Sequence, residues 1–304
     1  MYLLRRILFL VPLLLVISLL SFGLLRLTPG GPFDRDRAPA SEEIERQLRA
    51  RYHLDESIPR QYLRWLGEAA HGDFGLSLKY RNHSVSGIIR DGLPVSLTLG
   101  LLAFGFALGF GVPLGFYSAV HRGAWSDWGG SFLALVFICV PGFVVGPVLV
   151  LVFGLKLGWF PVGLWGAPLQ AVLPMVALGL YFGGRVARLL REGMTQALQS
   201  EFIRTARAKG LSEFAVLTGH ALRLALMPVV SYSGPMLADL LTGSFVVENL
   251  FQIPGIGVFM VNSSLSRDYP LVVGLVLLYA VLLLVLNLLV DLAYGLLDPR
   301  VRLN

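Results

Sequence analysis

The stretch PVSLTLGLLAFGFALGFGVPLGFYSAV, Pro94 to Val120, decides the fold class, because none of its residues carries a formal charge. A helix of about 20 apolar residues crosses the hydrocarbon core of a bilayer. The stretch therefore predicts a membrane-spanning helix. Its proline and glycine residues agree with this interpretation, since membrane helices tolerate both better than soluble helices do.

Other apolar runs of similar length recur along the chain. Charged residues make up 14% of the sequence and hydrophobic residues 55%, whereas a soluble domain carries about a quarter charged residues. Lipid is therefore the expected solvent, and the sequence predicts an all-α membrane protein with six transmembrane helices. The other apolar runs are Leu8–Leu27, Gly129–Leu155, Leu169–Leu190, Leu224–Val247 and Leu271–Gly295.

The net charge of +6 could indicate a nucleic-acid partner, but the basic residues gather at the ends of alternate apolar runs. An excess of Lys and Arg marks the cytoplasmic side of a membrane protein. The pattern places both termini in the cytoplasm, predicts contact with membrane lipid and argues against nucleic acid. The short outer loops contain only Lys156 and Arg267. The basic residues of the predicted cytoplasmic side are Arg5, Arg6, Arg122, Arg185, Arg188, Arg191, Arg204, Arg207, Lys209, Arg223, Arg300 and Arg302.

The predicted spans divide the chain into three regions. The first apolar run is too long for a signal peptide and predicts an uncleaved helix. In the outer segment we expect one helix from Ser41 to Tyr52 and a second at Gln61–Ala70. Cys139 lies within an apolar run and is expected to be a small buried hydrophobe. The regions are a first transmembrane helix at 1–27, a small extracytoplasmic subdomain at 28–93, and a membrane core at 94–304 with a cytoplasmic loop at 193–223.

A polar stretch, EFIRTARAKGLSEFAVLTGHALR, Glu201 to Arg223, separates two of the apolar runs. Ser200 is a suitable N-cap, Gly210 suits the left-handed residue that ends a helix, and Ser212 offers a second cap. The next helix is expected to stop or bend at Pro228. The pattern predicts helix, glycine break, helix. Two interpretations stay open: a basic helix on anionic headgroups, or a helix that docks a cytoplasmic partner.

The same stretch resembles the cytoplasmic coupling loop of binding-protein-dependent ABC importers, in the oligopeptide/dipeptide permease family. Arg204 and Thr205 stand where the broader superfamily has Glu and Ala, as is usual in the peptide branch. The resemblance covers essentially the whole chain. The chain is similar to the B-type permease subunit of the family, and the residues near His71–Tyr80 favour the oligopeptide member. The segments that carry it are Phe202–Leu211, His220–Arg223, Arg26–Phe33, Tyr52–Asp55, His71–Gly75, Leu78–Tyr80, Gly243–Glu248, Pro254–Gly257, Arg267–Pro270 and Leu297–Arg302.

The resemblance implies a permease subunit in a bacterial inner membrane that moves oligopeptides or dipeptides by alternating access. Its implied partners are a homologous C-type permease, two ATPases and an extracytoplasmic peptide-binding protein. The sequence has no GxxxxGK[ST] phosphate loop, so ATP and Mg²⁺ are expected on the partner ATPases and no cofactor on this chain. The implied coupling residues are Phe202, Arg204, Ala206, Ala208, Lys209, Gly210 and Leu211. The implied extracytoplasmic docking or gate residues are Glu248, Pro254, Gly255 and Gly257.

Charged residues inside spans are costly and are candidates for function. Asp239 could face the translocation pathway and attract the positive groups of a peptide, or could bond to a neighbouring helix. Arg185, Arg188 and Arg191 are expected to snorkel toward the cytoplasmic end of their span. A secondary transporter predicts embedded ion ligands or an inverted repeat, and neither is clear. An intramembrane protease predicts a GxSG or HExxH motif, and the sequence contains neither. Peptide length, and peptides versus metal chelates or glutathione, stay open.

Overall fold

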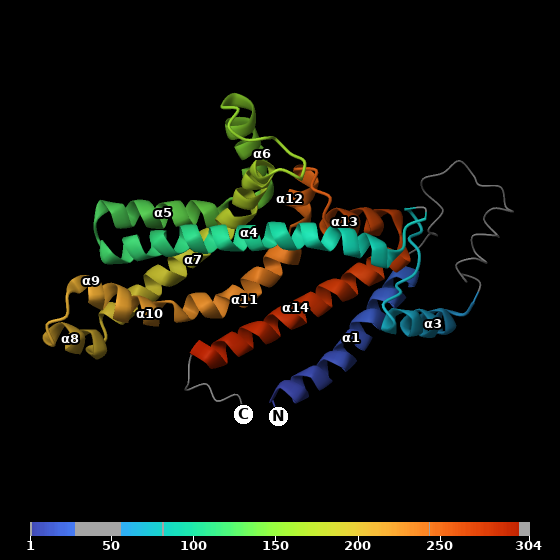
Figure 1. The fold of residues 1–304 in the computed structure, drawn as a ribbon, viewed down its shortest axis with the longest axis horizontal. Helices are drawn as coiled ribbons and strands as arrows, with labels where there is room; N and C mark the ends of the chain where they lie inside the picture. The colour runs from blue at the N-terminus through green and yellow to red at the C-terminus, as the bar shows by residue number, and fades with distance from the viewer. Residues whose placement is uncertain (1, 28–55, 81, 243, 298–304) are drawn as a thin grey trace. The chain divides into compact units, whose positions relative to one another are not determined.

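A computed structural model describes residues 2–27, 56–80, 82–242 and 244–297 of the chain (Figure 1). Within these ranges the regular structure is helical, apart from one isolated antiparallel bridge between Leu76 and Ser84. The all-α prediction is confirmed for the described residues. The described residues form two compact units: those of unit 1 fall within Met1–Val95 and Gly255–Leu284, and those of unit 2 within Ser96–Pro254 and Val285–Leu303.

Unit 1 buries two apolar clusters. Phe22, Trp65 and Val273 form one of them, and their rings and methyl groups lie away from solvent. Val85 and Leu271 are fully buried in the other, together with Ile256. The outer segment therefore packs on membrane helices of its own unit. The helices that contribute to unit 1 are α1 (Tyr2–Leu27), α3 (Ile58–Ala70), the start of α4 (Val85–Val120), α13 (Ile256–Ser266) and the start of α14 (Tyr269–Leu297).

The outer segment differs from its predicted boundaries in two places. Pro59 lies in the first turn of α3, where the missing N–H of proline costs nothing, so the helix begins three residues before Gln61. α4 begins at Val85, nine residues before the predicted start at Pro94, because a polar turn of helix precedes the apolar run. The helix expected from Ser41 to Tyr52 lies outside the described residues.

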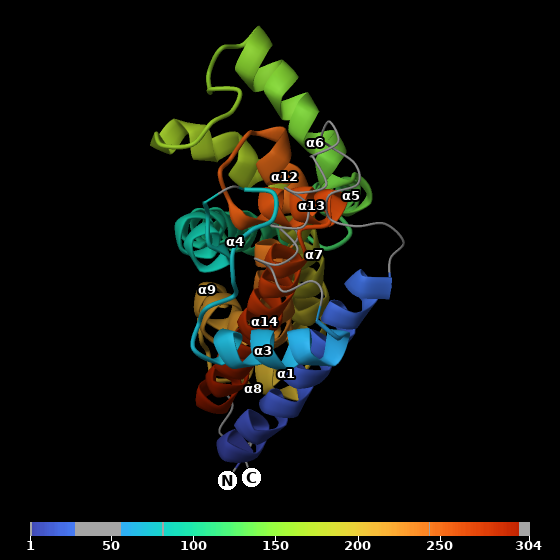
Figure 2. The same cartoon turned by 90° about the vertical axis from the view of Figure 1, so that its right-hand side faces the viewer.

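Unit 2 is organised around α7 (Val172–Leu198), the long helix against which α5, α6, α10 and α11 pack (Figure 1). Figure 1 and Figure 2 both place α6 and α12 at one end of α7 and α8 at the other. The remaining elements of the unit are α5 (Trp125–Cys139), α6 (Gly142–Leu149), η1 (Val150–Lys156), η2 (Pro168–Ala171), α8 (Glu201–Ala208), α9 (Glu213–Ala215), η3 (Val216–Ala221), α10 (Leu222–Ala225), α11 (Met227–Thr242) and α12 (Phe245–Leu250).

Glycines let α4 approach α7 closely inside unit 2. A Cβ added to Gly111 would meet the carbonyl oxygen of Gly183 at 2.5 Å, and one added to Gly115 would meet the backbone of Ala187. Small residues at helix crossings are typical of membrane bundles, because dispersion between close backbones replaces the hydrophobic effect. This crossing fixes the position of the second half of α7, which leads to the polar stretch.

All six predicted apolar runs are helical where they are described, but they are not all single straight spans. Among the residues that the structure describes, three helices are long and apolar enough to cross a membrane, or up to five if each bent pair counts as one span. The run Gly129–Leu155 bends by 105° between α5 and Gly142, at Pro141. The prediction for Cys139 was wrong, because this residue is exposed at the end of α5.

Candidate functional site

The polar stretch folds as two short helices separated by Gly210. α8 ends at Ala208, Gly210 has φ +80°, and the Ser212 hydroxyl accepts a hydrogen bond from the backbone N–H of Ala215 at the start of α9. The predicted helix–glycine–helix pattern is confirmed. Ser200 has the extended backbone of an N-cap, but its hydroxyl donates back to the carbonyl of Ala197 at 2.7 Å. Its predicted side-chain cap is therefore absent.

The inner face of α8 holds the helix on the rest of unit 2. Ile203 and Ala206 are buried, and α8 packs against η3. The ring of Phe202 lies 5.5 Å from the ring of His220 in η3. The small side chain of Ala206 therefore serves packing within this chain, and its surface is not open to a partner as the sequence analysis expected. These contacts attach α8 to η3, which continues directly into α10.

The outer face of the same segment carries large exposed apolar side chains. Phe202 is 58% exposed, Leu211 42% and Phe214 77%. Exposed aromatic residues outside a span favour contact with a protein partner. These three side chains and the exposed residues at the turn between them form one surface, which we call the coupling surface. It consists of Phe202, Ala208, Lys209, Gly210, Leu211 and Phe214. Sequence reasoning missed Phe214, although its place two residues after the Ser212 cap was available as a signal.

Two ion pairs fix the shape of this segment from its surface. Arg207 in α8 donates to both carboxylate oxygens of Glu213 in α9, at 2.7 and 3.1 Å, and so bridges the Gly210 turn. This hydrogen bond raises the pKa of the Arg207 guanidinium, which is charged at physiological pH even without it. Arg204 pairs with Glu201 at 2.7 Å within α8. Arg204, an expected coupling residue, already has a local partner, whereas Lys209 is exposed without an ion pair among the described residues.

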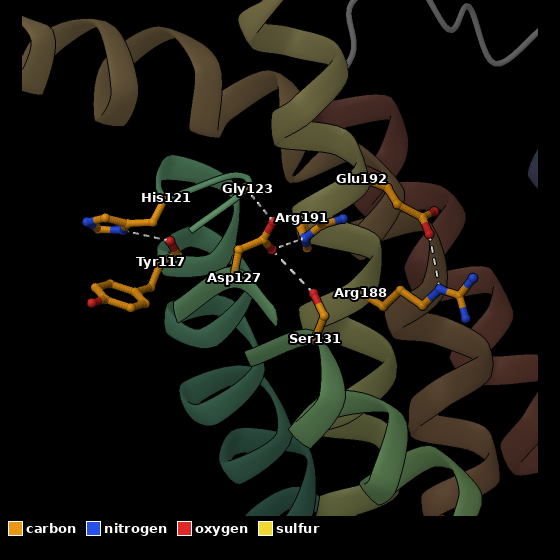
Figure 3. A network of polar contacts seen from close by, with 8 residues as sticks. All are labelled: Tyr117, His121, Gly123, Asp127, Ser131, Arg188, Arg191 and Glu192. Atoms are coloured by element: carbon orange, nitrogen blue, oxygen red, sulfur yellow. Dashed lines mark hydrogen bonds and ion pairs between the residues drawn. The ribbon is translucent and has the colours of Figure 1, made fainter. Parts of the chain in front are cut away.

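A buried carboxylate ties α5 to α7 in unit 2 (Figure 3). Asp127 is 4% exposed and accepts from Arg191 Nε at 2.6 Å and Nη2 at 2.8 Å. The backbone N–H of Gly123 and the hydroxyl of Ser131 also donate to this carboxylate. The guanidinium of Arg191 is thus held in a paired, two-bond geometry, and the expectation that this side chain snorkels toward the cytoplasmic end stays a prediction. α7 also continues to Leu198, eight residues beyond the predicted end of the span.

The expected outer docking residues occupy different environments. Glu248 in α12 is completely buried, and its Oε1 accepts from the hydroxyls of Ser96 at 2.7 Å and Ser244 at 2.6 Å. A carboxylate with no exposed surface cannot contact a separate protein, so the structure assigns Glu248 to the interior of unit 2. Gly255 and Gly257 are also buried, and Pro254 is exposed.

Two segments that carry the family resemblance meet in unit 1. Asp268, in the Arg267–Pro270 segment, is fully buried and accepts a hydrogen bond from Ser77, which directly precedes the Leu78–Tyr80 segment. The backbone N–H of Lys79 donates to the same oxygen at 3.1 Å, and that of Leu271 to the other oxygen at 3.3 Å. Sequence reasoning noted both segments but had no signal that they bind each other across about 190 positions.

Two charged residues of the predicted spans, Asp239 and Arg185, lie on neighbouring helices of unit 2. Asp239 in α11 is exposed. Arg185 in α7 is also exposed, and its Nη1 donates to the Tyr232 hydroxyl of α11 at 3.2 Å. Its guanidinium lies 5.6 Å from the ring centre of Tyr181 and 5.3 Å from that of Tyr232. Asp239 and Arg185 were both candidates from the sequence, but the contact of Arg185 with Tyr232 had no sequence signal, because α7 and α11 are far apart in the chain.

Comparison with known proteins decides the family. Residues 111–303 match the family described as "Binding-protein-dependent transport system inner membrane component". The chain belongs to this family. It is 40% identical to the oligopeptide transport system permease protein OppB of Haemophilus influenzae over 303 residues, covering 99% of each chain. It is 42% identical to OppB of Escherichia coli (strain K12), again covering 99% of each chain. It is 41% identical to the dipeptide transport system permease protein DppB of Bacillus subtilis, covering 100% of this chain and 98% of that one.

Solved structures agree at the level of the fold. An inward-facing structure of the MetNI methionine ABC transporter superposes with a TM-score of 0.59 at 18% identity, covering 69% of this chain and 96% of that one. A crystal structure of an amino acid ABC transporter gives a TM-score of 0.51 at 19% identity, covering 67% and 92%. This permease is therefore a multi-pass protein of the inner membrane and a transport subunit, not an enzyme.

Proposed function

We propose that this permease is the B-type subunit of an ATP-driven importer that carries oligopeptides or dipeptides into the cell. The observation that carries the proposal is the full-length similarity, at 40–42% identity, to permease proteins of oligopeptide and dipeptide transport systems. Its partners in this proposal are a homologous C-type permease, two ATPases and an extracytoplasmic peptide-binding protein. ATP and Mg²⁺ are bound by the ATPases, and this chain contributes no phosphate loop.

The proposed topology has six spans with both termini in the cytoplasm. Each bent pair counts as one span, with α1 as the sixth, and the basic residues then collect on the cytoplasmic side. The outer subdomain at 28–93 and the coupling loop at 193–223 lie on opposite sides of the membrane in this arrangement. A bent pair is compatible with one crossing, because a proline inside a membrane helix can be accommodated by neighbouring helices.

The coupling surface is proposed to bind a cytoplasmic ATPase. Phe202, Leu211 and Phe214 offer apolar anchors, and Lys209 adds a positive charge that favours a correctly oriented encounter. Ile203 and Ala206 then pass the motion of the ATPase to η3 and α10, since both side chains are buried against this chain. Closure of the ATPases on ATP would thus move the cytoplasmic ends of the spans and alternate the access of the pathway.

One experiment tests this function as a whole. The tagged chain is extracted from its own host in mild detergent, and the proteins that purify with it are identified by mass spectrometry. The complex is then placed in vesicles with ATP inside and the binding protein with radiolabelled trialanine outside. We expect a second permease, two phosphate-loop ATPases and uptake that stops with a non-hydrolysable ATP analogue. Recovery of the chain alone, or uptake only of a metal chelate or of glutathione, would contradict the proposal.

A further inference from the structure

Unit 2 presents a cation and an anion on neighbouring helices of its predicted spans. Arg185 in α7 and Asp239 in α11 are both exposed, and α7 packs against α11. Arg185 lies inside the predicted span Leu169–Leu190, five residues before its end, about 7.5 Å of helix rise. An ionised side chain inside a span is costly unless it faces water or a partner charge. Both residues are therefore candidates for binding a charged group.

Arg185 is held in a defined position without being neutralised. The Tyr232 hydroxyl accepts from Nη1 at 3.2 Å, and the rings of Tyr181 and Tyr232 both lie within 6 Å of the guanidinium carbon. Aromatic faces attract the cation and fix its plane. They supply no negative charge, so the donors of the guanidinium that do not bond to Tyr232 remain available for a carboxylate, which Arg binds through two parallel bonds.

Asp239 is placed to complement this cation on the same face of α11. It follows Tyr232 by seven residues, two helical turns, which corresponds to about 10 Å of rise. α11 packs against α7, so Asp239 and Arg185 lie on neighbouring helices. None of the hydrogen bonds and ion pairs found among the described residues occupies the Asp239 carboxylate. The two helices thus offer opposite charges, with Asp239 two helical turns beyond the tyrosine that Arg185 contacts.

We propose that Arg185 and Asp239 form a subsite that recognises the two charged ends of a short peptide, Arg185 its carboxylate and Asp239 its ammonium group. The two helical turns between Tyr232, which Arg185 contacts, and Asp239 are comparable in length with an extended peptide of about three residues, at roughly 3.5 Å for each residue. This inference rests on the proposed function, because it names the substrate group that each side chain binds. Tyr181 and Tyr232 position Arg185 and are not themselves assigned to the substrate.

The same helix supplies a matched control. Arg188 lies three residues after Arg185 and is equally exposed, but Glu192 neutralises it at 3.0 Å. A general effect of removing an arginine from this stretch of α7 would appear in both Arg188→Gln and Arg185→Gln. An effect that depends on a free cation would appear only in Arg185→Gln.

The test measures selectivity in the complete transporter. Vesicles containing wild-type, Arg185→Gln, Asp239→Asn or Arg188→Gln complexes take up trialanine, its C-terminal amide and its N-acetyl form. Each uptake rate is measured with saturating binding protein, and the ratio of two peptides is compared between variants. Because the binding protein is the same throughout, its own preference for charged termini cancels from the comparison.

We expect Arg185→Gln to lower the preference for trialanine over its amide at least tenfold, with the preference over the N-acetyl form unchanged. Asp239→Asn should do the reverse, and Arg188→Gln should leave both preferences as in wild type. Equal losses for all three peptides would overturn the subsite. An equal loss that depends on anionic lipid in the vesicles would assign Arg185 to a lipid phosphate and would also overturn it. Wild-type vesicles with no ATP-dependent uptake of any peptide would instead contradict the proposed function.

Discussion

The coupling segment, Glu201–Phe214, and the α12 segment, Ser244–Gly257, both carry the family resemblance, and sequence reasoning gives both a partner. The two segments differ in the exposure of the side chains that stand out in them. Phe214 is 77% exposed in the coupling segment, whereas Glu248 in the α12 segment has no exposed surface. A motif residue can therefore hold the fold together as readily as it can contact another protein.

The surroundings of the charged side chains explain why the two segments differ in exposure. The ion pairs of the coupling segment, Arg204–Glu201 and Arg207–Glu213, lie in water and cost little to form. Glu248 is instead surrounded by protein, so its carboxyl group depends on Ser96 and Ser244 for hydrogen bonds. Substitution of Glu248 in the α12 segment should therefore lower the stability of the protein. Substitution in the coupling segment should leave the stability almost unchanged and should alter assembly with a partner instead.

The largest loss of stability is expected from Glu248→Ala. The change leaves the hydroxyls of Ser96 and Ser244 without this acceptor and opens a cavity, which together cost about 3 kcal/mol. The thermal unfolding midpoint of the purified chain in detergent measures the loss. Glu201→Ala, at an exposed position of α8, is the control and should shift the midpoint little. Equal midpoints for the two variants would contradict the stabilising role given to Glu248.

A smaller loss of stability is expected from Arg191→Met. This variant tests whether the burial of a charged group, and not the side of the membrane on which it lies, determines the loss of stability. Asp127 would remain almost fully buried without its cation, at a cost of about 2 kcal/mol, reduced by the partial exposure of Arg191. Arg188→Met removes an arginine whose ion pair with Glu192 is exposed and should change unfolding by less than about 0.5 kcal/mol. A result in which both variants unfold at the same temperature would remove the structural role given to Asp127.

Gly210→Ala should cost about 1 kcal/mol, because an alanine at φ +80° is strained although nothing crowds its Cβ. Its effect on assembly should be larger, since the turn sets where Leu211 and Phe214 point. Gly219→Ala is the control: it has equal space and no positive φ. We expect only Gly210→Ala to lose the ATPases on purification. Full retention of the ATPases with an unchanged unfolding temperature would show that the turn is not required.

The local features of the fold could be predicted from the sequence, and the distant pairings could not. The apolar runs and the helix–Gly210–helix pattern depend on neighbouring residues, so composition and capping rules suffice. The contact of Arg191 with Asp127 joins residues 64 positions apart, and the enclosure of Ala206 depends on where α8 packs. Periodicity carries no information about either. The resemblance supplied the segment that is expected to couple to a partner, but the exposure of Phe214 came from the structure alone.

The smallest change in stability and the most direct test both concern Phe214. A photo-cross-linking phenylalanine analogue at this exposed position should shift unfolding by less than about 0.5 kcal/mol, and the same analogue at Leu63, 65% exposed in α3, is the control. After illumination of intact cells, the Phe214 probe should form a covalent product with a phosphate-loop ATPase, and the Leu63 probe should not. An active transporter in which the Phe214 probe reacts only with lipid, or both probes capture the ATPase equally, would contradict the assignment of the coupling surface.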